Sequence, residues 1–425
     1  MQPLDKKLVD EARMELASMR EGPWHEPGKW SVSPYNFLDS IKERQTAVPP
    51  KITISELTPR LLEQMPGVFL SSADRMLLLE QMAEMNIPEV HVGILPYKSP
   101  LLEEVRLIAK RGFPFNLVAV IHNPEQAAIL ADAGVDTMEV VTFPRPILQA
   151  AVMGRKPVST EVHLSQAAAT LEAIKKLGVK VRADVTDVGI ADLAYIEAFS
   201  RNAHSLKVDS IHIADSSSTM GHHATAEIVR LVKSVAPGMP VGLHPHNDFG
   251  LAMATAVAGL EAGVEIFDTS VDGIGEKAGQ LNLGTFVLVC EAFYRIKTGI
   301  NLEGLQKLSI LSAKLSGMPI PCYTPLTGED AFSATLEHHR RLQDEVDPMI
   351  LASISPAVVG NRKHNSLGLH SGKYGLWCEA KAMDIELTEE QLDVAHKQLL
   401  GLLKEHRRRI TRAEIEKVLH SVSSV

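Results

Sequence analysis

The chain alternates between two hydrophobic patterns from residue 51 to about residue 271. Short apolar runs rich in branched residues are separated by longer stretches with helical spacing of apolar positions. Runs of this length are typical of buried strands, and the longer stretches of helices. Several of these helices end in a glycine just before the next run, for example Ala133-Gly134 and Ala262-Gly263. The predicted strands are Lys51–Leu57, Glu89–Ile94, Phe115–Ile121, Thr137–Phe143, Lys180–Val185, Ser210–Ala214, Val241–His246 and Glu265–Val271.

Eight strand–helix units over about 250 residues predict an α/β fold of the (β/α)₈ or TIM-barrel class. A doubly wound sheet is the alternative. That fold normally has a glycine-rich phosphate loop after its first strand, and Thr58-Pro-Arg-Leu-Leu is not such a loop. We therefore predict a barrel over residues 51–300, preceded by an N-terminal arm over residues 1–50.

Residues 301–425 do not continue the alternation. Their apolar spacing predicts a small, mostly helical C-terminal region, with two amphipathic helices between Thr388 and Val418. The arm combines a short amphipathic helix, from Lys6 to Arg20, with irregular chain that contains aromatic residues, which either the body of the protein or a neighbouring subunit would cover. Apolar groups of this kind need to be covered, so a homodimer is expected.

Composition excludes several classes of function. The net charge is −9, so there is no basic excess to neutralise the phosphates of a nucleic acid. The three cysteines are far apart, which predicts neither a disulfide framework nor a zinc knuckle and fits a reducing cytoplasm. No signal peptide and no apolar run of about 18 residues occurs, which predicts a soluble protein without a membrane partner.

Two histidines lie at the end of the seventh predicted strand, in the stretch His244-Pro-His246-Asn-Asp. Residues i and i+2 of a strand point to the same side, so both imidazoles share one face. Such a pair can bind a metal ion or act in catalysis. It can also be a pair of loop histidines bonded to the backbone, and the spacing alone leaves both interpretations open.

Polar side chains follow most of the other predicted strands. Active sites of TIM barrels lie at the carboxyl ends of the strands, where these side chains meet. Taken singly, most of them would be loop residues or helix caps. Taken together they predict one site, formed by Glu56, Arg60, His122, Asp184, Asp187, Asp215, Ser216, His244, His246, Asn247, Asp272, Glu276 and Lys277.

Two stretches resemble the DRE-TIM metallolyase superfamily. They are His244-Pro-His-Asn-Asp-Phe-Gly-Leu-Ala-Met-Ala and Val271-Asp-Gly-Ile-Gly-Glu-Lys-Ala-Gly, within a resemblance that covers about residues 50–380. The loop Leu369-His-Ser-Gly is similar to a loop of the 2-isopropylmalate and homocitrate synthase branch. The lyase branch has a catalytic cysteine in its last glycine-rich loop, and Gly273-Ile-Gly-Glu-Lys lacks one.

The resemblance implies an acyltransferase that forms a carbon–carbon bond between an acyl-CoA co-substrate and a 2-oxo acid, a small carboxylate. It also implies a divalent metal ion (Mg, Mn or Zn), polarisation of the ketone by that ion, and a histidine supplied by the second subunit of a homodimer. Carried onto this sequence, it gives catalytic residues Arg60, Asp184, Glu63 and His339; substrate-binding residues Gln64, His122, Thr142, Ser216 and Asn247; and metal ligands His244, His246 and Gln280.

Leu61 departs from the family pattern, because it occupies the position of the metal-binding aspartate. A hard cation prefers anionic oxygen, and leucine offers no ligand. Three interpretations remain open. Glu56, Glu63, Asp215 or the substrate could supply the oxygen ligands. The site could instead be metal-free, with related chemistry such as that of a metal-independent lyase or aldolase. The chain could also be a non-catalytic binding paralogue.

Overall fold

The computed structural model describes residues 3–94, 100–154, 156–364 and 367–423. Eight parallel strands close into a barrel in which each strand pairs with the next one along the chain and the last pairs with the first. The prediction of a TIM barrel is therefore confirmed. Its strands are β3 (Thr53–Glu56), β4 (Glu89–Ile94), β5 (Asn116–Ile121), β6 (Thr137–Thr142), β7 (Lys180–Thr186), β8 (Ser210–Asp215), β9 (Val241–Pro245) and β10 (Ile266–Thr269).

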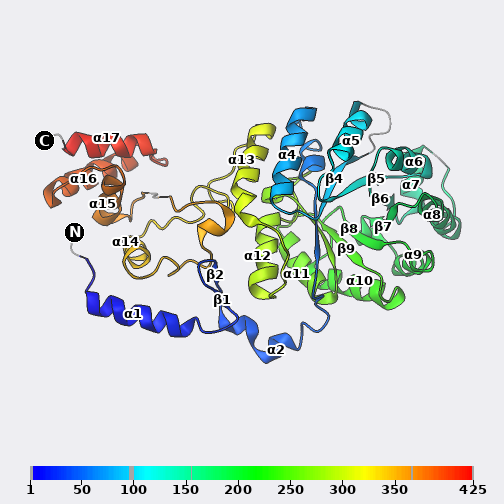
Figure 1. Cartoon of the computed structure of the whole chain (residues 1–425), viewed down its shortest axis with the longest axis horizontal. Helices are drawn as coiled ribbons and strands as arrows, with labels where there is room; N and C mark the ends of the chain where they lie inside the picture. The colour runs from blue at the N-terminus through cyan, green and yellow to red at the C-terminus, as the bar shows by residue number, and fades with distance from the viewer. Residues whose placement is uncertain (1–2, 95–99, 155, 365–366, 424–425) are drawn as a thin grey trace. The chain divides into compact units, whose positions relative to one another are not determined.

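Helices lie between consecutive strands and surround the barrel (Figure 1). They use the local signals that the sequence carries; Ser71, for example, caps α4 through a reciprocal pair of bonds with Asp74. The helices of this part are α2 (Asp39–Lys42), α3 (Thr58–Leu62), α4 (Ser72–Glu84), α5 (Pro100–Arg111), α6 (Pro124–Asp132), α7 (Pro146–Met153), α8 (Thr160–Lys175), α9 (Leu193–Ser205), α10 (His222–Val235), α11 (Ala252–Ala262), α12 (Leu283–Phe293) and α13 (Leu305–Ser316).

The chain divides into two compact units. Residues 37–320 form the barrel unit, and the residues before 37 form the second unit together with those from 321 onward. The second unit contains α1 (Lys6–Met19), the two-stranded sheet of β1 (His25–Glu26) and β2 (Trp30–Ser31), α14 (Glu337–Arg341), α15 (Gly372–Ala382), α16 (Glu389–His406) and α17 (Arg412–Ser423).

Within the second unit, the arm is attached to the C-terminal region by polar contacts. Arg20 and Asp347 form a two-pronged ion pair, at 2.7 and 2.9 Å, and Arg13 donates to the carbonyl oxygen of Val346. Helices α15, α16 and α17 share an apolar core that includes Leu376 and Leu399. The predicted amphipathic helices are therefore present. The part of the predicted arm before residue 37 belongs to the same unit as the C-terminal helices, whereas residues 37–50 belong to the barrel unit.

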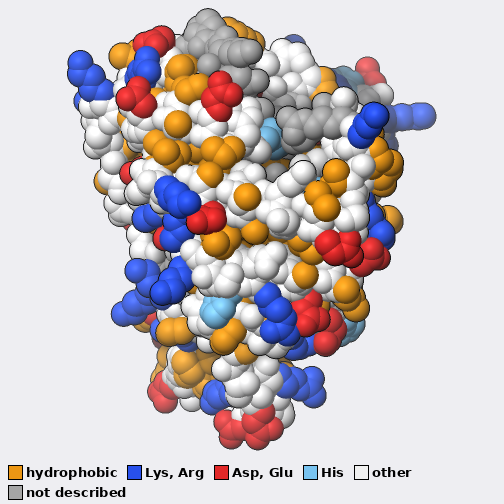
Figure 2. All heavy atoms as spheres, turned by 90° about the vertical axis from the view of Figure 1, so that its right-hand side faces the viewer, with side chains coloured by type: hydrophobic (Ala, Val, Ile, Leu, Met, Phe, Trp, Pro, Cys, Tyr) orange, Lys and Arg blue, Asp and Glu red, His pale blue; other side chains and the backbone are white. Residues whose placement is uncertain are grey.

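No helix in the described part of the chain is long and apolar enough to cross a membrane. On the face shown in Figure 2, basic and acidic side chains are interspersed, without a field of one sign. This surface gives no support to a nucleic-acid partner, which requires a basic patch.

Gly242 on β9 makes room for a buried imidazole of the neighbouring strand. A Cβ atom at this position would lie 1.7 Å from Nε2 of His212, whose ring is fully buried. We expect Gly242→Ala to destabilise the protein by about 1–3 kcal/mol or more, because an overpacked core must shift side chains and backbone. Urea unfolding measures the loss. Gly221→Ala is the control, because a Cβ there meets nothing within 4 Å, and an equal loss in both variants would contradict the prediction.

Candidate active site

A small cavity of about 120 Å³ opens at the carboxyl ends of the barrel strands. It has about four times the volume that one water molecule occupies in the liquid, which suits a compact ligand. Its lining unites residues from six regions of the chain, and the sequence analysis singled out residues in five of them. The predicted site residues that line it are Arg60, Gln64, Asp184, Ser216, His244, His246, Glu276 and Gln280.

His244 and His246 do share one face, as the strand spacing predicts. Their ring centroids are 5.2 Å apart, and both Nε2 atoms point toward the side chain of Gln280. Nδ1 of His244 bonds to Oδ2 of Asp268 on β10 at 2.8 Å. Burial lowers the pKa of His244 to about 4 and that of His246 to about 3, with neighbouring positive charge adding to the effect. Both rings are therefore neutral at physiological pH.

The amide of Gln280 lies between the two imidazoles. Its Nε2 atom is 3.0 Å from Nε2 of His244 and 3.4 Å from Nε2 of His246. An ionised Asp268 can only accept, so in that state Nδ1–H of His244 donates to it and the Nε2 atom of His244 carries the lone pair. The Gln280 amide nitrogen is the group that can donate to it. His246 and Gln280 are also joined by a backbone bridge, which fixes the two elements relative to each other.

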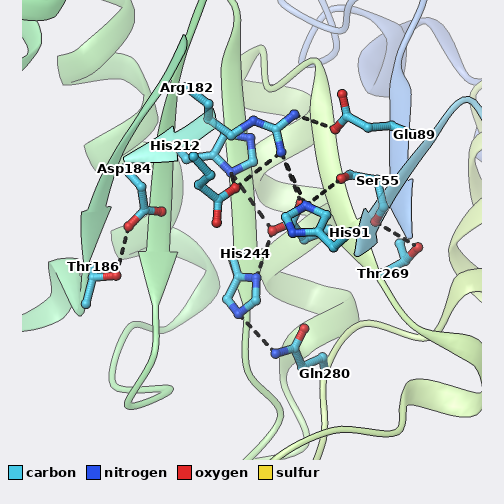
Figure 3. A network of polar contacts seen from close by, with 12 residues as sticks. Ser55, Glu89, His91, Arg182, Asp184, Thr186, His212, His244, Thr269 and Gln280 are labelled. Atoms are coloured by element: carbon cyan, nitrogen blue, oxygen red, sulfur yellow. Dashed lines mark hydrogen bonds and ion pairs between the residues drawn. The ribbon is translucent and has the colours of Figure 1, made fainter. Parts of the chain in front are cut away.

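A buried network of charged residues lies beside the histidine pair inside the barrel (Figure 3). Arg182 on β7 forms its closest ion pair with Glu89 on β4. Its Nη1 atom is 3.3 Å from Glu139 on β6 and 4.0 Å from Asp268. Burial raises the pKa of Glu139, and it raises that of Asp268 to about 7, while Arg182 opposes both shifts. This guanidinium is therefore what makes three buried carboxylates tolerable in one place.

Arg60 brings a second positive charge to the cavity. It lies on α3, directly after the first barrel strand, and its side chain is 12% exposed. Its Nη1 atom is 3.8 Å from Glu139 and 3.4 Å from Nδ1 of His91. Its Nε atom is buried and finds no hydrogen-bond partner within the described residues. Arg60 therefore keeps donor capacity for a ligand in the cavity.

Asp184 is a fully buried carboxyl group on β7. Its Oδ1 atom accepts a hydrogen bond from Thr186 at 2.8 Å. Burial raises its pKa well above the ordinary value, and the charge of Glu139 adds to the shift. A carboxyl group with a raised pKa at the wall of a cavity is a candidate for proton transfer.

Several predicted site residues lie outside the lining of the cavity. Glu63 pairs with the buried Arg75 at 2.7 Å, an interaction that anchors α3 to α4. Asn247 caps the start of α11, since its Oδ1 atom accepts from the backbone of Ala252. His122 directly follows β5, and Thr142 is the last residue of β6. Neither side chain lines the cavity. His339 belongs to the second unit, where it lines a separate cavity of about 470 Å³ with apolar neighbours such as Leu336.

The sequence analysis missed the interior charges of the barrel. The missed residues share one pattern, in that they are polar residues in mostly apolar strands. Glu89 and His91 pair with each other at i and i+2, and Arg182 pairs in the same way with Asp184. In a barrel this spacing places both side chains on the interior face. That signal could have found Glu89, His91, Glu139, Arg182, His212 and Asp268.

Three of these interior residues have the composition of a metal site. His91, Glu139 and Asp268 each offer one ligand atom within 4.8 Å of the others. However, Arg182 already contacts both carboxylates, and Arg60 approaches Glu139 from the other side. The ring nitrogens of His91 face Ser55 at 3.0 Å and Arg60 at 3.4 Å. A divalent cation here would lie beside two guanidinium groups, so the cluster fits a metal poorly.

Leu61 is 1% exposed and packs beneath the glycine-rich loop that follows β10. A Cβ atom on Gly275 would lie 3.5 Å from Cδ1 of Leu61 and 3.3 Å from Cγ of Gln280. The leucine and the glutamine therefore flank the same glycine, so hydrocarbon lies where the family pattern would place a carboxylate.

A family described as HMGL-like matches residues 51–311 of the chain. The chain is 30% identical over 339 residues to a probable 2-isopropylmalate synthase from Ignicoccus hospitalis, covering 79% of this chain and 84% of that one. A homocitrate synthase from Methanothermobacter thermautotrophicus is 27% identical over 89% of this chain and 92% of its own. A putative (R)-citramalate synthase from Archaeoglobus fulgidus is 27% identical over 88% of this chain and 76% of its own.

Solved structures show the same fold. An HMG-CoA lyase from Bacillus subtilis matches 65% of this chain and 97% of its own, with a TM-score of 0.58 and 19% identity. At this identity the likeness establishes the barrel and says nothing about the reaction.

Proposed function

The chain belongs to the HMGL-like family, and from this premise we propose that it forms a carbon–carbon bond between an acyl-CoA donor and the carbonyl carbon of a 2-oxo acid. One observation supports synthesis over cleavage. The relatives named as synthases match 79–89% of the chain, so their similarity continues well beyond the barrel. The loop Gly273-Ile-Gly-Glu-Lys also lacks the cysteine of the lyase branch.

The cavity offers a place for the 2-oxo acid and a charge for its oxyanion. A donor with spare bonding capacity, Arg60, lies beside a space that suits a small carboxylate. When the new bond forms, the carbonyl electrons move onto oxygen, and a guanidinium stabilises that negative charge. The family pattern implies a divalent cation at the same point. Two imidazoles and an amide, with hydrocarbon at Leu61, do not form a ligand set that fits a divalent cation. No step here therefore uses a cation.

The remaining groups move protons. A base removes a proton from the α-carbon of the acyl-CoA, the resulting enolate attacks the ketone carbon, and the alkoxide then takes up a proton. Asp184 has the raised pKa that suits this exchange. We assign the second acid–base role to His339 of another copy of the chain, in a homodimer. Water then cleaves the thioester, releasing a carboxylate and CoA with a free thiol.

The test is release of CoA thiol from acetyl-CoA in the presence of a panel of small 2-oxo acids. We expect release above background with at least one acid, and loss of that release in His339→Ala. Mixing His339→Ala with an Arg60→Gln variant should restore part of the activity if the two residues act across a dimer. Absence of CoA release with every acid would contradict the condensation.

The lyase or aldolase alternative has its own outcome in the same experiment. If the condensation assay is silent, the chain should be given the corresponding 2-hydroxy-2-alkyl dicarboxylates and their thioesters. Formation of a 2-oxo acid from any of them would support cleavage. No reaction in either direction would leave the non-catalytic paralogue as the supported interpretation.

A further inference from the structure

We propose that the histidine pair is a metal-free site in which the side-chain amide of Gln280 takes the position of the family's cation. The proposal rests on the proposed function only for the substrate, since the geometry of the pair stands by itself. It is carried by three observations: the bonding of the Gln280 amide, the hydrocarbon at residue 61, and the positive charges that already neutralise the nearby carboxylates.

The amide nitrogen uses the lone pairs that a cation would need. It has two hydrogens, and it faces the Nε2 atoms of His244 and His246 at 3.0 and 3.4 Å. Imidazole binds a metal through such a lone pair, and a lone pair that accepts an N–H bond is no longer available. A cation could enter only if the buried Gln280 side chain, 2% exposed, moved away from both rings.

The tautomer that this arrangement needs is set from the opposite side of the ring. Oδ2 of Asp268 lies 2.8 Å from Nδ1 of His244, and when this carboxyl is ionised it accepts Nδ1–H, which leaves Nε2 as the acceptor. In metal sites the same kind of carboxylate contact orients a ligand histidine toward its ion. Here the oriented lone pair meets an amide donor instead.

No anionic oxygen completes a coordination shell at this point. Leu61 is hydrocarbon and lies with Gln280 against Gly275. The nearest cluster of carboxylates is already paired with Arg182, and Arg60 lies 3.8 Å from Glu139. Mg²⁺ and Mn²⁺ prefer carboxylate and water oxygens, so two neutral imidazoles would hold them weakly.

A chemical consequence follows for the proposed reaction. Without a dication, Arg60 is the cation nearest to the cavity with spare donor capacity, and it has to supply the polarisation of the ketone. Gln280 would then be a positioning residue, which holds the two neutral rings at the wall of the cavity. Its own Oε1 atom is buried and has no partner within the described residues, so it can accept a hydrogen bond from a ligand hydroxyl.

The experiment measures metal binding directly. The wild-type chain is purified without chelator, and its Mg, Mn and Zn content is determined by elemental analysis. Mn²⁺ is then titrated and followed by electron paramagnetic resonance of the free ion. We expect substoichiometric metal and no saturable binding that differs from His244→Ala. Stoichiometric metal, or Mn²⁺ binding that His244→Ala abolishes, would overturn the proposal.

Restoring the family ligands provides the converse test. Gln280→Asn withdraws the amide by one methylene, and Leu61→Asp adds the missing carboxylate. The double variant should bind Mn²⁺ at least about tenfold more tightly than the wild type, and Mn²⁺ should raise its melting temperature. If Leu61→Asp prevents folding, the metal content of the wild-type chain still decides the proposal. Where the double variant folds, Mn²⁺ binding no tighter than in Leu61→Asp alone would contradict the claim that the amide blocks the site.

The result of the metal-binding experiment can be distinguished from the result of the CoA-release test of the proposed function. Metal binding is read without turnover, and CoA release is assayed in the presence of a chelator. Metal-dependent CoA release would overturn this inference and keep the condensation. Absence of both metal and CoA release would keep the inference and contradict the condensation.

Discussion

Arg60→Gln is expected to lower kcat for the condensation by about 10²–10³-fold, the range for removing one preorganised group that stabilises an oxyanion. The expectation is strong because no other guanidinium with spare donor capacity lines the described cavity. Glutamine keeps much of the length and polarity of the side chain but removes its charge. Steady-state kinetics of CoA release measure the effect.

Two further variants make the result specific. Arg60→Lys keeps the charge at a single point and should retain more activity than Arg60→Gln, although it loses the planar fork. Arg111→Gln removes an exposed arginine of α5 and should leave kcat unchanged. A loss confined to KM in Arg60→Gln would show that the residue binds the ground state of the substrate and would contradict its role at the oxyanion.

Arg182→Met is expected to destabilise the barrel by about 3–5 kcal/mol, the range for breaking a buried ion pair by removing one partner. The substitution leaves Glu89, Glu139 and Asp268 buried without their main counter-charge. Methionine fills part of the vacated volume, so the effect is mainly electrostatic. Urea unfolding at several pH values measures the change in the free energy of unfolding.

The free energy of unfolding should change with pH in a definite direction. Asp268 has a pKa of about 7 in the folded protein against 3.8 in the reference state, and the pKa of Glu139 is raised as well. The folded protein therefore binds more protons than the unfolded chain between these values, so stability falls as pH rises from about 4 to 7. Loss of Arg182 raises both pKa values further, so in the variant the fall should continue above pH 7.

The control for this prediction is an exposed arginine. Arg201 pairs with Glu197 one turn away on α9, and both side chains are largely exposed. Arg201→Met should cost less than about 0.5 kcal/mol, with no dependence on pH of the kind described. Adding Glu89→Gln to Arg182→Met should recover part of the lost stability. A variant with wild-type stability at pH 8 would show that the buried carboxylates do not need Arg182.

The hydrophobic pattern alone determined the barrel. All eight predicted apolar runs contain strands, because strands with both faces covered are mostly apolar. The i, i+2 spacing likewise determined that His244 and His246 share a face. Six of the thirteen polar side chains predicted at the strand ends line one cavity, because parallel strands bring their carboxyl ends to one edge.

The partners of these side chains were decided only by the tertiary structure. Glu63 looked catalytic by alignment, but in the fold it pairs with Arg75, a residue of the next helix. Arg182 was part of a strand in the sequence, and its contacts with Glu89, Glu139 and Asp268 come from three other strands. Sequence spacing sets the face of one strand, whereas ion pairs depend on the register between strands.

Gln280 shows most clearly which features the sequence determines and which only the tertiary structure decides. By its resemblance to the family, the sequence placed Gln280 at the position of a metal-binding asparagine and Leu61 at that of the aspartate, and it left open which group, if any, replaces the carboxylate. Only the fold brought the Gln280 amide between the two Nε2 atoms, through a loop that bridges to His246 and a carboxylate, Asp268, that sets the tautomer of His244. The direction of a hydrogen bond depends on what holds the other end of the ring, and that partner lies on a different strand.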